Sequence, residues 1–412
     1  MPIAGWMFWA FILHLGPNDF HDYWLAGRLV LQGHSPYDAQ ALADLATREH
    51  LTFLLGGGYS YPLPFAVAMV PFGALPFEES VVLFNALSIA AFGVSVAGWI
   101  VWAHGADPLL GRRRLLLALA AGVYPPVYGT VAMGQANLIL FPLLALGTAL
   151  ALDGSGRGRQ AAGGVVLGVA AIVKLFPGAL VVPLMLGRRF RAAGGILAGA
   201  AGALALATAL APWAASGSGG LSSLFDTDAF YTNQSINGFV SRLVLATDRS
   251  VAIVPGALDP RALMLGLTAA FGVATLWVLW GARDRLGTRR GLALGLGLAL
   301  VAGTIGAPKN SFWNESATLL CAGLLLAVEA PDLHPGRLGR IDLALLVTWF
   351  GCAVAWAAVW AVEPPAAGPL SAMVTLAWSS SLYGLLALWI LFVRRLWRAA
   401  DPAAAQESAT IS

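Results

Sequence analysis

The chain has 412 residues, of which 58% are hydrophobic and only 11% are charged, and its mean hydropathy is +0.75. A soluble domain carries roughly 25% charged residues, so this composition excludes an ordinary soluble enzyme and predicts an all-α polytopic membrane protein. The net charge is only +3, and no basic patch interleaved with aromatic residues is present. Membrane lipids are therefore expected partners, and nucleic acid is not.

Apolar runs recur along the whole chain. A spanning helix needs about 20 apolar residues, and the candidate runs are 1–16, 80–103, 115–131, 136–152, 160–174, 177–187, 192–213, 263–281, 290–306, 316–330, 341–362 and 371–393. They predict a single bundle of roughly 11–13 membrane helices over residues 1–398, followed by a tail over 399–412. The first run has no basic leader or small-residue cleavage site, which argues against a cleaved signal peptide.

Two places in this pattern predict interrupted helices. Residues 62–76 are apolar but short and proline-rich, and a re-entrant or half-depth helix there keeps the orientation of the other runs consistent. Runs 160–174 and 177–187 meet at Lys174-Leu175-Phe176-Pro177, which predicts a tight turn or helix break. Such breaks are tolerated where they are buried in protein or line a wet cavity.

Arginine clusters set the predicted orientation, because basic residues concentrate in cytoplasmic connections. The clusters are Arg112–Arg114, Arg157/Arg159, Arg188/Arg189/Arg191, Arg283/Arg285/Arg289/Arg290, Arg337/Arg340 and Arg394/Arg395/Arg398. These connections and both termini should be cytoplasmic. The outward-facing connections should be 17–61, 124–136, 213–262, 307–315 and 363–370. Because the Ala-, Gly- and Arg-rich composition is typical of a bacterial source, the expected location is a bacterial cytoplasmic membrane.

The first outward loop is the most informative segment. It contains Asp19-Phe20-His21-Asp22-Tyr23 directly after an apolar run, and Tyr61 ends it. A carboxylate at a membrane boundary can act as a general base that removes a proton from an attacking hydroxyl. Helix capping by Asp19, with Asp22 as a solvated acid of the first turn, is an open alternative.

The two lysines give a second signal. Although the chain has 24 basic residues, only Lys174 and Lys309 are lysine. Both fall at predicted outward helix ends, beside Pro177 and Pro308, where an orientation signal does not explain them. Each can hold a phosphate as a point charge or snorkel to the membrane interface, and both interpretations stay open.

Amide and aromatic side chains gather at other outward helix ends. Residues of this kind suit sugar hydroxyls and sugar faces, whereas helix capping and interfacial anchoring are the alternative. The group consists of Gln135, Asn137, Asn233, Gln234, Asn237, Trp313 and Glu315, with Arg242 in the long outward loop.

Taken in order, these segments resemble the motifs of glycosyltransferase family 87, also described as the DUF2029 family, within the GT-C superfamily. Known members include mycobacterial polyprenol-phosphate-mannose-dependent α-1,2-mannosyltransferases. The resemblance covers roughly residues 15–330. It rests on Asp19-Phe20-x-x-Tyr23-x-x-Ala26, Gly33-x-x-Pro36-Tyr37, Tyr61-Pro62, Leu75-Pro76, Gly134-Gln135-x-Asn137, Lys174-x-x-Pro177 and Asn233-Gln234-Ser235 with Arg242.

The resemblance implies a GT-C-like bundle with its active site on the non-cytoplasmic face. It implies a metal-independent, inverting transfer of a sugar, with mannose favoured, from a polyprenyl-phosphate donor to a lipid or glycan acceptor, with no cofactor. Asp19 matches the catalytic base, with Asp22 as the alternative, and Lys174 and Arg242 would neutralise the donor phosphate together with Lys309. The expected sugar- or acceptor-binding residues are His21, Tyr23, Tyr61, Gln135, Asn137, Asn233, Gln234, Asn237, Trp313 and Glu315.

One segment departs from the family pattern. Many members have Ser-Pro-x-Ser-Trp-x-His near residues 307–315, and here Glu315 stands where the histidine would align. A multi-helix transporter or flippase of amphiphilic substrates is the alternative function. It predicts inverted repeats and polar residues near the midplane, whereas the polar clusters here gather on one predicted face.

Overall fold

The structure is a computed structural model, and it describes residues 16–51, 58–104, 118–153, 156–215, 226–247, 252–254, 259–329, 339–360, 362 and 369–398. Within these ranges the chain is helical, and the isolated antiparallel bridge between Asn233 and Ser311 forms no sheet. The all-α prediction is confirmed. Outside the described residues lie run 1–16 except Gly16, the Arg112–Arg114 cluster, Arg337 and the 399–412 tail.

The described helices follow one another along the chain. They are α2 (Asn18–Leu31), α3 (Ala39–Arg48), α4 (Leu63–Ala68), α5 (Val70–Gly73), α6 (Phe77–His104), α8 (Pro125–Met133), α9 (Asn137–Leu152), α10 (Arg157–Val173), η3 (Phe176–Leu180), α11 (Val181–Leu186), α12 (Phe190–Leu210), η4 (Pro212–Ala215), α13 (Ile236–Val244), α14 (Pro260–Gly281), α15 (Arg289–Gly306), η6 (Phe312–Thr318), α16 (Leu319–Glu329), α17 (Arg340–Val359), α18 (Pro369–Ala377) and α19 (Ser380–Arg398).

Several of these helices are long and apolar enough to cross a membrane. Among the described residues there are five such segments, Phe77–Trp102, Phe190–Leu210, Pro260–Gly281, Arg340–Val359 and Ser380–Arg398. The apolar segments Asn137–Leu152 and Phe176–Leu186 are shorter. The chain is therefore a multi-pass membrane protein, and the larger number of spans expected from the apolar runs stays a prediction.

Two of the predicted runs are wrong as single helices. Run 115–131 is interrupted at Tyr124, where Pro125 starts α8, because proline fits the first turn of a helix but not its interior. Run 371–393 is divided by a turn at Trp378 and Ser379 into α18 and α19. The apolar windows do not detect these breaks because the residues on both sides remain apolar.

Both predicted interruptions are present. Residues 62–76 form the short helices α4 and α5, which are separated at Met69. Between α10 and η3 the chain is extended at Lys174, with φ −133° and ψ 127°. The segment after Lys174 then continues as a 3₁₀ turn that begins at Phe176.

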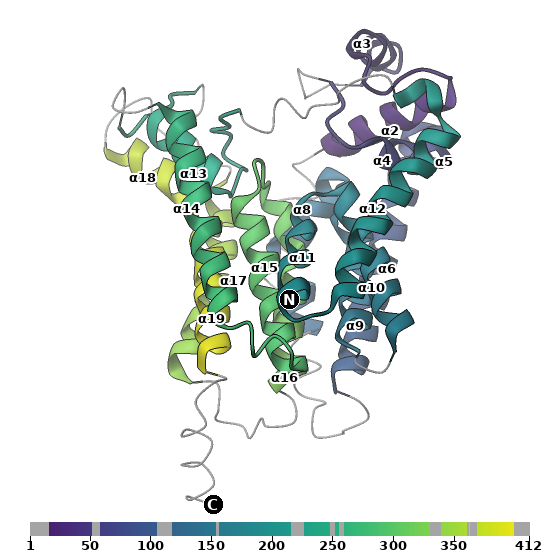
Figure 1. Cartoon of the computed structure of the whole chain (residues 1–412). Helices are drawn as coiled ribbons and strands as arrows, with labels where there is room; N and C mark the ends of the chain where they lie inside the picture. Colours follow the sequence, from purple (N-terminus) through teal and green to yellow (C-terminus); the bar gives the residue numbers. More distant parts are fainter. Residues whose placement is uncertain are drawn as a thin grey trace, which may run out of the picture.

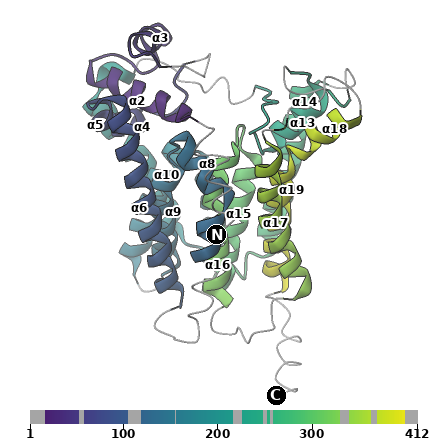
Figure 2. The same cartoon turned by 180° about the vertical axis from the view of Figure 1, so that it is seen from behind.

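The short N-terminal helices occupy one end of the bundle. Figures 1 and 2 show α2, α3, α4 and α5 together at that end, while α19 runs down to the opposite end. Near the C-terminal end, Asp342 of α17 pairs with Arg395 of α19 at 3.1 Å. At this same end, Arg285 donates to the Leu396 carbonyl at 2.8 Å. These described arginines therefore lie opposite α2, as the orientation pattern requires.

Close backbone contacts fix the position of α10. A Cβ added at Gly164 or Gly168 would lie 2.0 Å from the Ala192 carbonyl or 2.1 Å from the Ile196 carbonyl of α12. Small residues spaced four apart let helix backbones approach in this way in lipid. The rigid α10–α12 pair therefore carries the break at Lys174.

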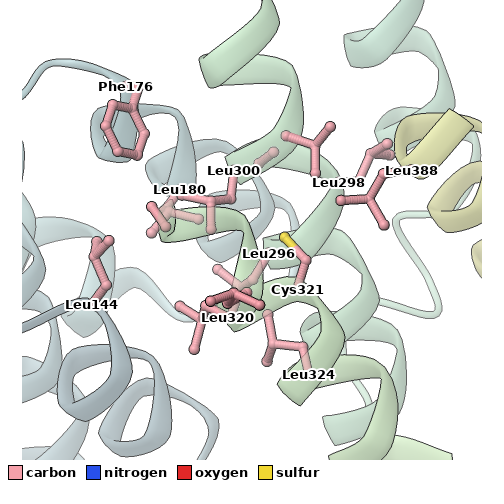
Figure 3. Close-up of a cluster of buried hydrophobic side chains, with 14 of the residues drawn as sticks. Leu144, Phe176, Leu180, Leu296, Leu298, Leu300, Leu320, Cys321, Leu324 and Leu388 are labelled. Carbon is pink, nitrogen blue, oxygen red and sulfur yellow. The ribbon is translucent and has the colours of Figure 1, made fainter. Parts of the chain in front are cut away.

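The largest hydrophobic core lies among α9, η3, α15, α16 and α19. Leucines of α9, η3, α15, α16 and α19 meet there, as Figure 3 shows for Leu144, Leu180, Leu296, Leu320 and Leu388. Leu180, Leu296, Leu320 and Leu388 are each no more than 1% exposed. The helices α9, η3 and α16, which adjoin the polar site described below, are packed together by this apolar core.

Candidate active site

The turn between α8 and α9 presents Gln135 to the interior. Gly134 ends α8 with φ 64°, and the Gln135 amide donates to the Thr130 carbonyl at 2.9 Å. This left-handed end favours glycine. A Cβ at Gly134 would also lie 2.5 Å from the Cβ of Phe20. The local sequence thus fixes the direction in which Gln135 leaves the turn.

Gln135 joins two charged side chains through its amide. Its Nε2 donates to Oδ2 of Asp19, and its Oε1 accepts a 2.9 Å hydrogen bond from Nζ of Lys174. The hydroxyl of Tyr23 also lies 2.8 Å from the same Oε1. Because an amide has one donor end and one acceptor end, it can bind the carboxylate and the ammonium at the same time.

Lys174 is buried in this group. It is 9% exposed, and its Nζ also donates to Oδ1 of Asn314 at 2.7 Å. The ring of Tyr61 lies 5.6 Å from Nζ, within the range of a cation–π contact. Snorkelling of this lysine to the interface is therefore wrong.

The η6 segment closes the group from the other side. Asn137, the first residue of α9, donates to the Trp313 carbonyl and to Oδ1 of Asn314, both at 3.1 Å. Thr130 donates to the same Trp313 carbonyl at 2.9 Å. Asn314 thus receives hydrogen bonds from both Asn137 and Lys174.

We call Asp19, Tyr23, Tyr61, Gln135, Asn137, Lys174, Trp313 and Asn314 the Asp19–Lys174 cluster. Seven of its eight members were predicted site residues, and they come from five separate parts of the chain. Asn314 was missed as a site residue. Its position directly beside Trp313 was the available signal, but the sequence did not indicate that η6 would point both residues toward α9.

The two carboxylates of α2 differ in their surroundings. Burial raises the pKa of Asp19, but the hydrogen bond from Gln135, the charge of Lys174 and the Trp313 indole each lower it. Burial and the adjacent charge of Asp19 together raise the pKa of Asp22 to about 8. Asp19 is therefore the carboxylate whose ionised form receives direct stabilisation.

The capping alternative for these residues is wrong. The cap position of α2 is Pro17, and it makes no side-chain capping hydrogen bond. Asp19 instead faces Gln135, and Asp22 is only 3% exposed rather than solvated.

A second polar group lies around Arg242. This guanidinium is 1% exposed. It donates to the carbonyls of Phe230 and Asn233 at 2.8 and 2.9 Å, and to the Ser379 hydroxyl at 2.8 Å. It therefore binds two backbone oxygens and one hydroxyl, and none of these belongs to the Asp19–Lys174 cluster.

The predicted amides of the long outward loop belong to this second group. Gln234 donates to the Trp378 carbonyl at 2.7 Å, and Asn237 donates to the Pro308 carbonyl at 2.8 Å. Asn233 accepts from the Asn310 amide at 3.1 Å. We call Arg242, Asn233, Gln234 and Asn237, with the backbone that they bind, the Arg242 network.

The remaining predicted residues lie apart from both groups. Glu315 is fully buried and accepts a 2.5 Å hydrogen bond from the Ser381 hydroxyl. His21 packs against Phe77 with ring centroids 4.7 Å apart. Lys309 is exposed at the surface between α15 and η6. Their sugar-, acceptor- or phosphate-binding roles stay predictions.

The fold and the cluster together define a multi-pass membrane protein with a half-buried carboxylate and a buried lysine at one end of the bundle. Within the described residues, no group of three or more His, Cys, Asp and Glu side chains could hold a metal ion. A carboxylate beside a fixed cation can accept a proton at one atom and stabilise negative charge at another.

Residues 59–304, more than half of the chain, match the model of glycosyltransferase family 87. The chain therefore belongs to glycosyltransferase family 87 and is a membrane glycosyltransferase. No curated protein and no solved structure is significantly similar to it. Tyr61, Gln135 and Lys174 lie inside the matched region, whereas Asp19 precedes it and Trp313 follows it.

Proposed function

We propose that the chain transfers a sugar, with mannose as the first candidate, from a polyprenyl-phosphate donor to a lipid or glycan acceptor on the outer side of the membrane. The transfer inverts the anomeric centre, and Asp19 is the general base. The observation that carries the proposal is that Asp19 and Lys174 bind opposite ends of one amide, Gln135.

The reaction uses the two charges in different ways. The acceptor hydroxyl attacks the anomeric carbon while Asp19 takes its proton. The bond from that carbon to the phosphate oxygen breaks, and its electron pair leaves with the polyprenyl phosphate. Lys174 stabilises the negative charge that develops on this leaving group. The half-buried position of Asp19 and the buried position of Lys174 strengthen these interactions because water screens them less than at the surface.

Electrostatics favour Asp19 over Asp22 as the base. Asp22 has a pKa of about 8, so it is largely protonated at neutral pH and a poor proton acceptor. The same protonation removes one negative charge from the vicinity of Asp19. Burial raises the pKa of Asp19 as well, but the hydrogen bond from Gln135 and the charge of Lys174 oppose that rise, and Asp22 has no such partners.

The test compares purified wild type with Asp19→Asn, using radiolabelled polyprenyl phosphate mannose and a lipid extract as acceptor. We expect labelled product from wild type and a loss of about 10²–10⁴-fold in the variant, the usual contribution of a general base. Asp22→Asn is the matched control on the same helix and should retain most activity. Equal transfer by Asp19→Asn and wild type would overturn the role of Asp19. If wild type transfers from another sugar in a donor panel, only the mannose assignment fails.

A further inference from the structure

An apolar cavity of about 380 Å³ lies next to the Asp19–Lys174 cluster, between α14, α15 and the η3–α11 segment. Figure 1 shows these helices side by side in the front of the bundle. On α14 the lining residues are Thr268, Phe271, Gly272, Thr275, Leu276 and Leu279. This spacing is one stripe of a helix, and the eleven steps from Thr268 to Leu279, at a rise of 1.5 Å each, extend it over about 16 Å.

The opposite wall is made of small residues. Ala299, Ala302, Gly303 and Gly306 of α15 leave the space that larger side chains would fill. No charged residue lines the cavity. The hydroxyl of Thr275 is satisfied within the protein, since it donates to the Phe271 carbonyl at 3.0 Å. The cavity therefore suits a hydrocarbon chain and offers little to a polar ligand.

Two segments of the chain contribute residues both to the lining of the cavity and to the polar cluster. At the α10–η3 break, Lys174 points to Gln135, while the next residues, Leu175 and Phe176, line the cavity. The segment after α15 also contributes to both. Ala307 and Pro308 line the cavity, and Trp313 and Asn314 belong to the cluster.

The chain's two lysines bracket this junction. Lys174 directly precedes the lining residue Leu175, and Lys309 directly follows the lining residue Pro308. An amphiphile with a phosphate at the lysines would therefore have its hydrocarbon chain directed into the cavity.

Resting on the proposed function, we infer that this cavity, named here the α14–α15 groove, binds the first isoprene units of the polyprenyl donor. The donor phosphate lies between Lys174 and Lys309, and the chain runs along α14 toward the middle of the membrane. Lys309 is then a phosphate-binding residue at the mouth of the groove. The donor enters sideways from the lipid, between α14 and the η3–α11 segment.

Two glycines of α14 allow a matched test. Gly272 lines the groove and Gly266 does not, and a Cβ added at either position meets no atom within 4 Å. Gly272→Leu should therefore fill the groove without displacing backbone, and Gly266→Leu is the control on the same helix. Both variants should fold, because leucine has a higher helix propensity than glycine.

The first measurement is kcat/KM for a long polyprenyl phosphate mannose and for a short analogue, methyl phosphate mannose, which has no isoprene units to enter the groove. Gly272→Leu should lower the value for the long donor about tenfold or more, as expected for a changed apolar pocket. It should change the value for the short analogue much less, and Gly266→Leu should resemble wild type with both donors. An equal loss with both donors, or no loss, would overturn the groove assignment.

The second measurement does not require transfer. A polyprenyl phosphate carrying a photoreactive group near its phosphate end is cross-linked to the full chain in nanodiscs, and labelled peptides are identified. We expect labels on α14 and α15, lost in Gly272→Leu and retained in Gly266→Leu. Equal labelling of the lipid-facing helices α6 and α12 would mean ordinary lipid contact and would overturn the inference. Groove labelling by a wild type that transfers no sugar would leave the groove intact and count against the proposed function.

Discussion

The Asp19–Lys174 cluster and the Arg242 network contain similar residues but use them differently. In the first, side chains bind mainly other side chains, as Gln135 binds Asp19, Tyr23 and Lys174. In the second, side chains bind mainly backbone, as Arg242 binds the Phe230 and Asn233 carbonyls. A substrate can replace a side-chain partner, but backbone groups that lose their partner remain buried and unsatisfied. We therefore expect the first group to take part in the reaction and the second to hold loops in place.

The two groups are joined by residues 307–318. The Phe312 amide donates to the Thr232 carbonyl at 2.9 Å, and Asn310 is bound by Gln234 and Asn233. The next residues, Trp313 and Asn314, belong to the cluster. The Arg242 network thus fixes one end of the segment whose other end contacts Lys174.

Of the variants that compare the two groups, Lys174→Met should have the largest effect on transfer, and it tests whether the first group serves the reaction rather than stability. We expect transfer to fall about 10²–10³-fold, as when one charge-stabilising group is removed from an active site. The thermal midpoint should stay the same or rise, because the variant no longer buries a charge. Transfer assays and thermal unfolding in the same detergent measure both. A large fall in the midpoint would show that Lys174 is mainly structural.

Arg242→Met should give the reverse result. Removing the guanidinium leaves the Phe230 and Asn233 carbonyls buried without this partner, at a cost of about 2–4 kcal/mol. We expect a lower thermal midpoint and a loss of activity that follows the loss of folded protein. Activity per folded molecule, measured below the midpoint, should change little. A stable variant with abolished transfer would instead support a phosphate-binding role for Arg242.

Gly134→Ala tests whether the turn that directs Gln135 into the cluster is needed, and it leaves the charges of the cluster unchanged. The left-handed conformation costs a non-glycine residue about 1–2 kcal/mol, and the added Cβ would press on Phe20. Both transfer and stability should fall moderately, because Gln135 can no longer hold its direction. Gly158→Ala is a suitable control, since its Cβ would meet no atom within 4 Å. Equal behaviour of the two variants would contradict the assigned role of the turn.

Asp22→Asn should have the smallest effect on rate at neutral pH, and its main effect should be on the pH dependence of stability. The folded pKa of about 8 lies above the ordinary 3.8, so the folded chain holds this proton more tightly than the unfolded chain. The resulting stability is complete below about pH 4 and is lost as pH rises through about 8. The midpoint of the variant relative to wild type should rise over that interval, and parallel curves would contradict it.

Much of the fold follows from apolar runs, but its breaks do not. The runs identified α6, α12 and α14 because each has enough apolar residues in one helix. They did not indicate the turn at Trp378 and Ser379, which Gln234 and Arg242 hold from distant parts of the chain. A break stabilised by long-range partners leaves no local change in composition.

The sequence also predicted which residues form the site better than it predicted which of them lie together. The motif order identified Asp19, Gln135 and Lys174, and these residues do converge. The same order placed Arg242 with them, because sequence order contains no distance. The neighbours that separate the two groups, such as the Phe230 carbonyl and Ser379, are backbone atoms and a common serine. No residue pattern marks such partners in advance.

The amide of Gln135 has a further consequence for the order of events. Its donor end faces the carboxylate and its acceptor end faces the ammonium, so the two charges keep the amide dipole in one orientation. In the proposed transfer, Asp19 becomes neutral when it takes the proton of the acceptor, so the amide dipole is then oriented by Lys174 alone. The Lys174 ammonium would be freer to turn from the amide oxygen toward the departing phosphate. We therefore expect Gln135 to couple protonation of Asp19 to stronger phosphate binding by Lys174.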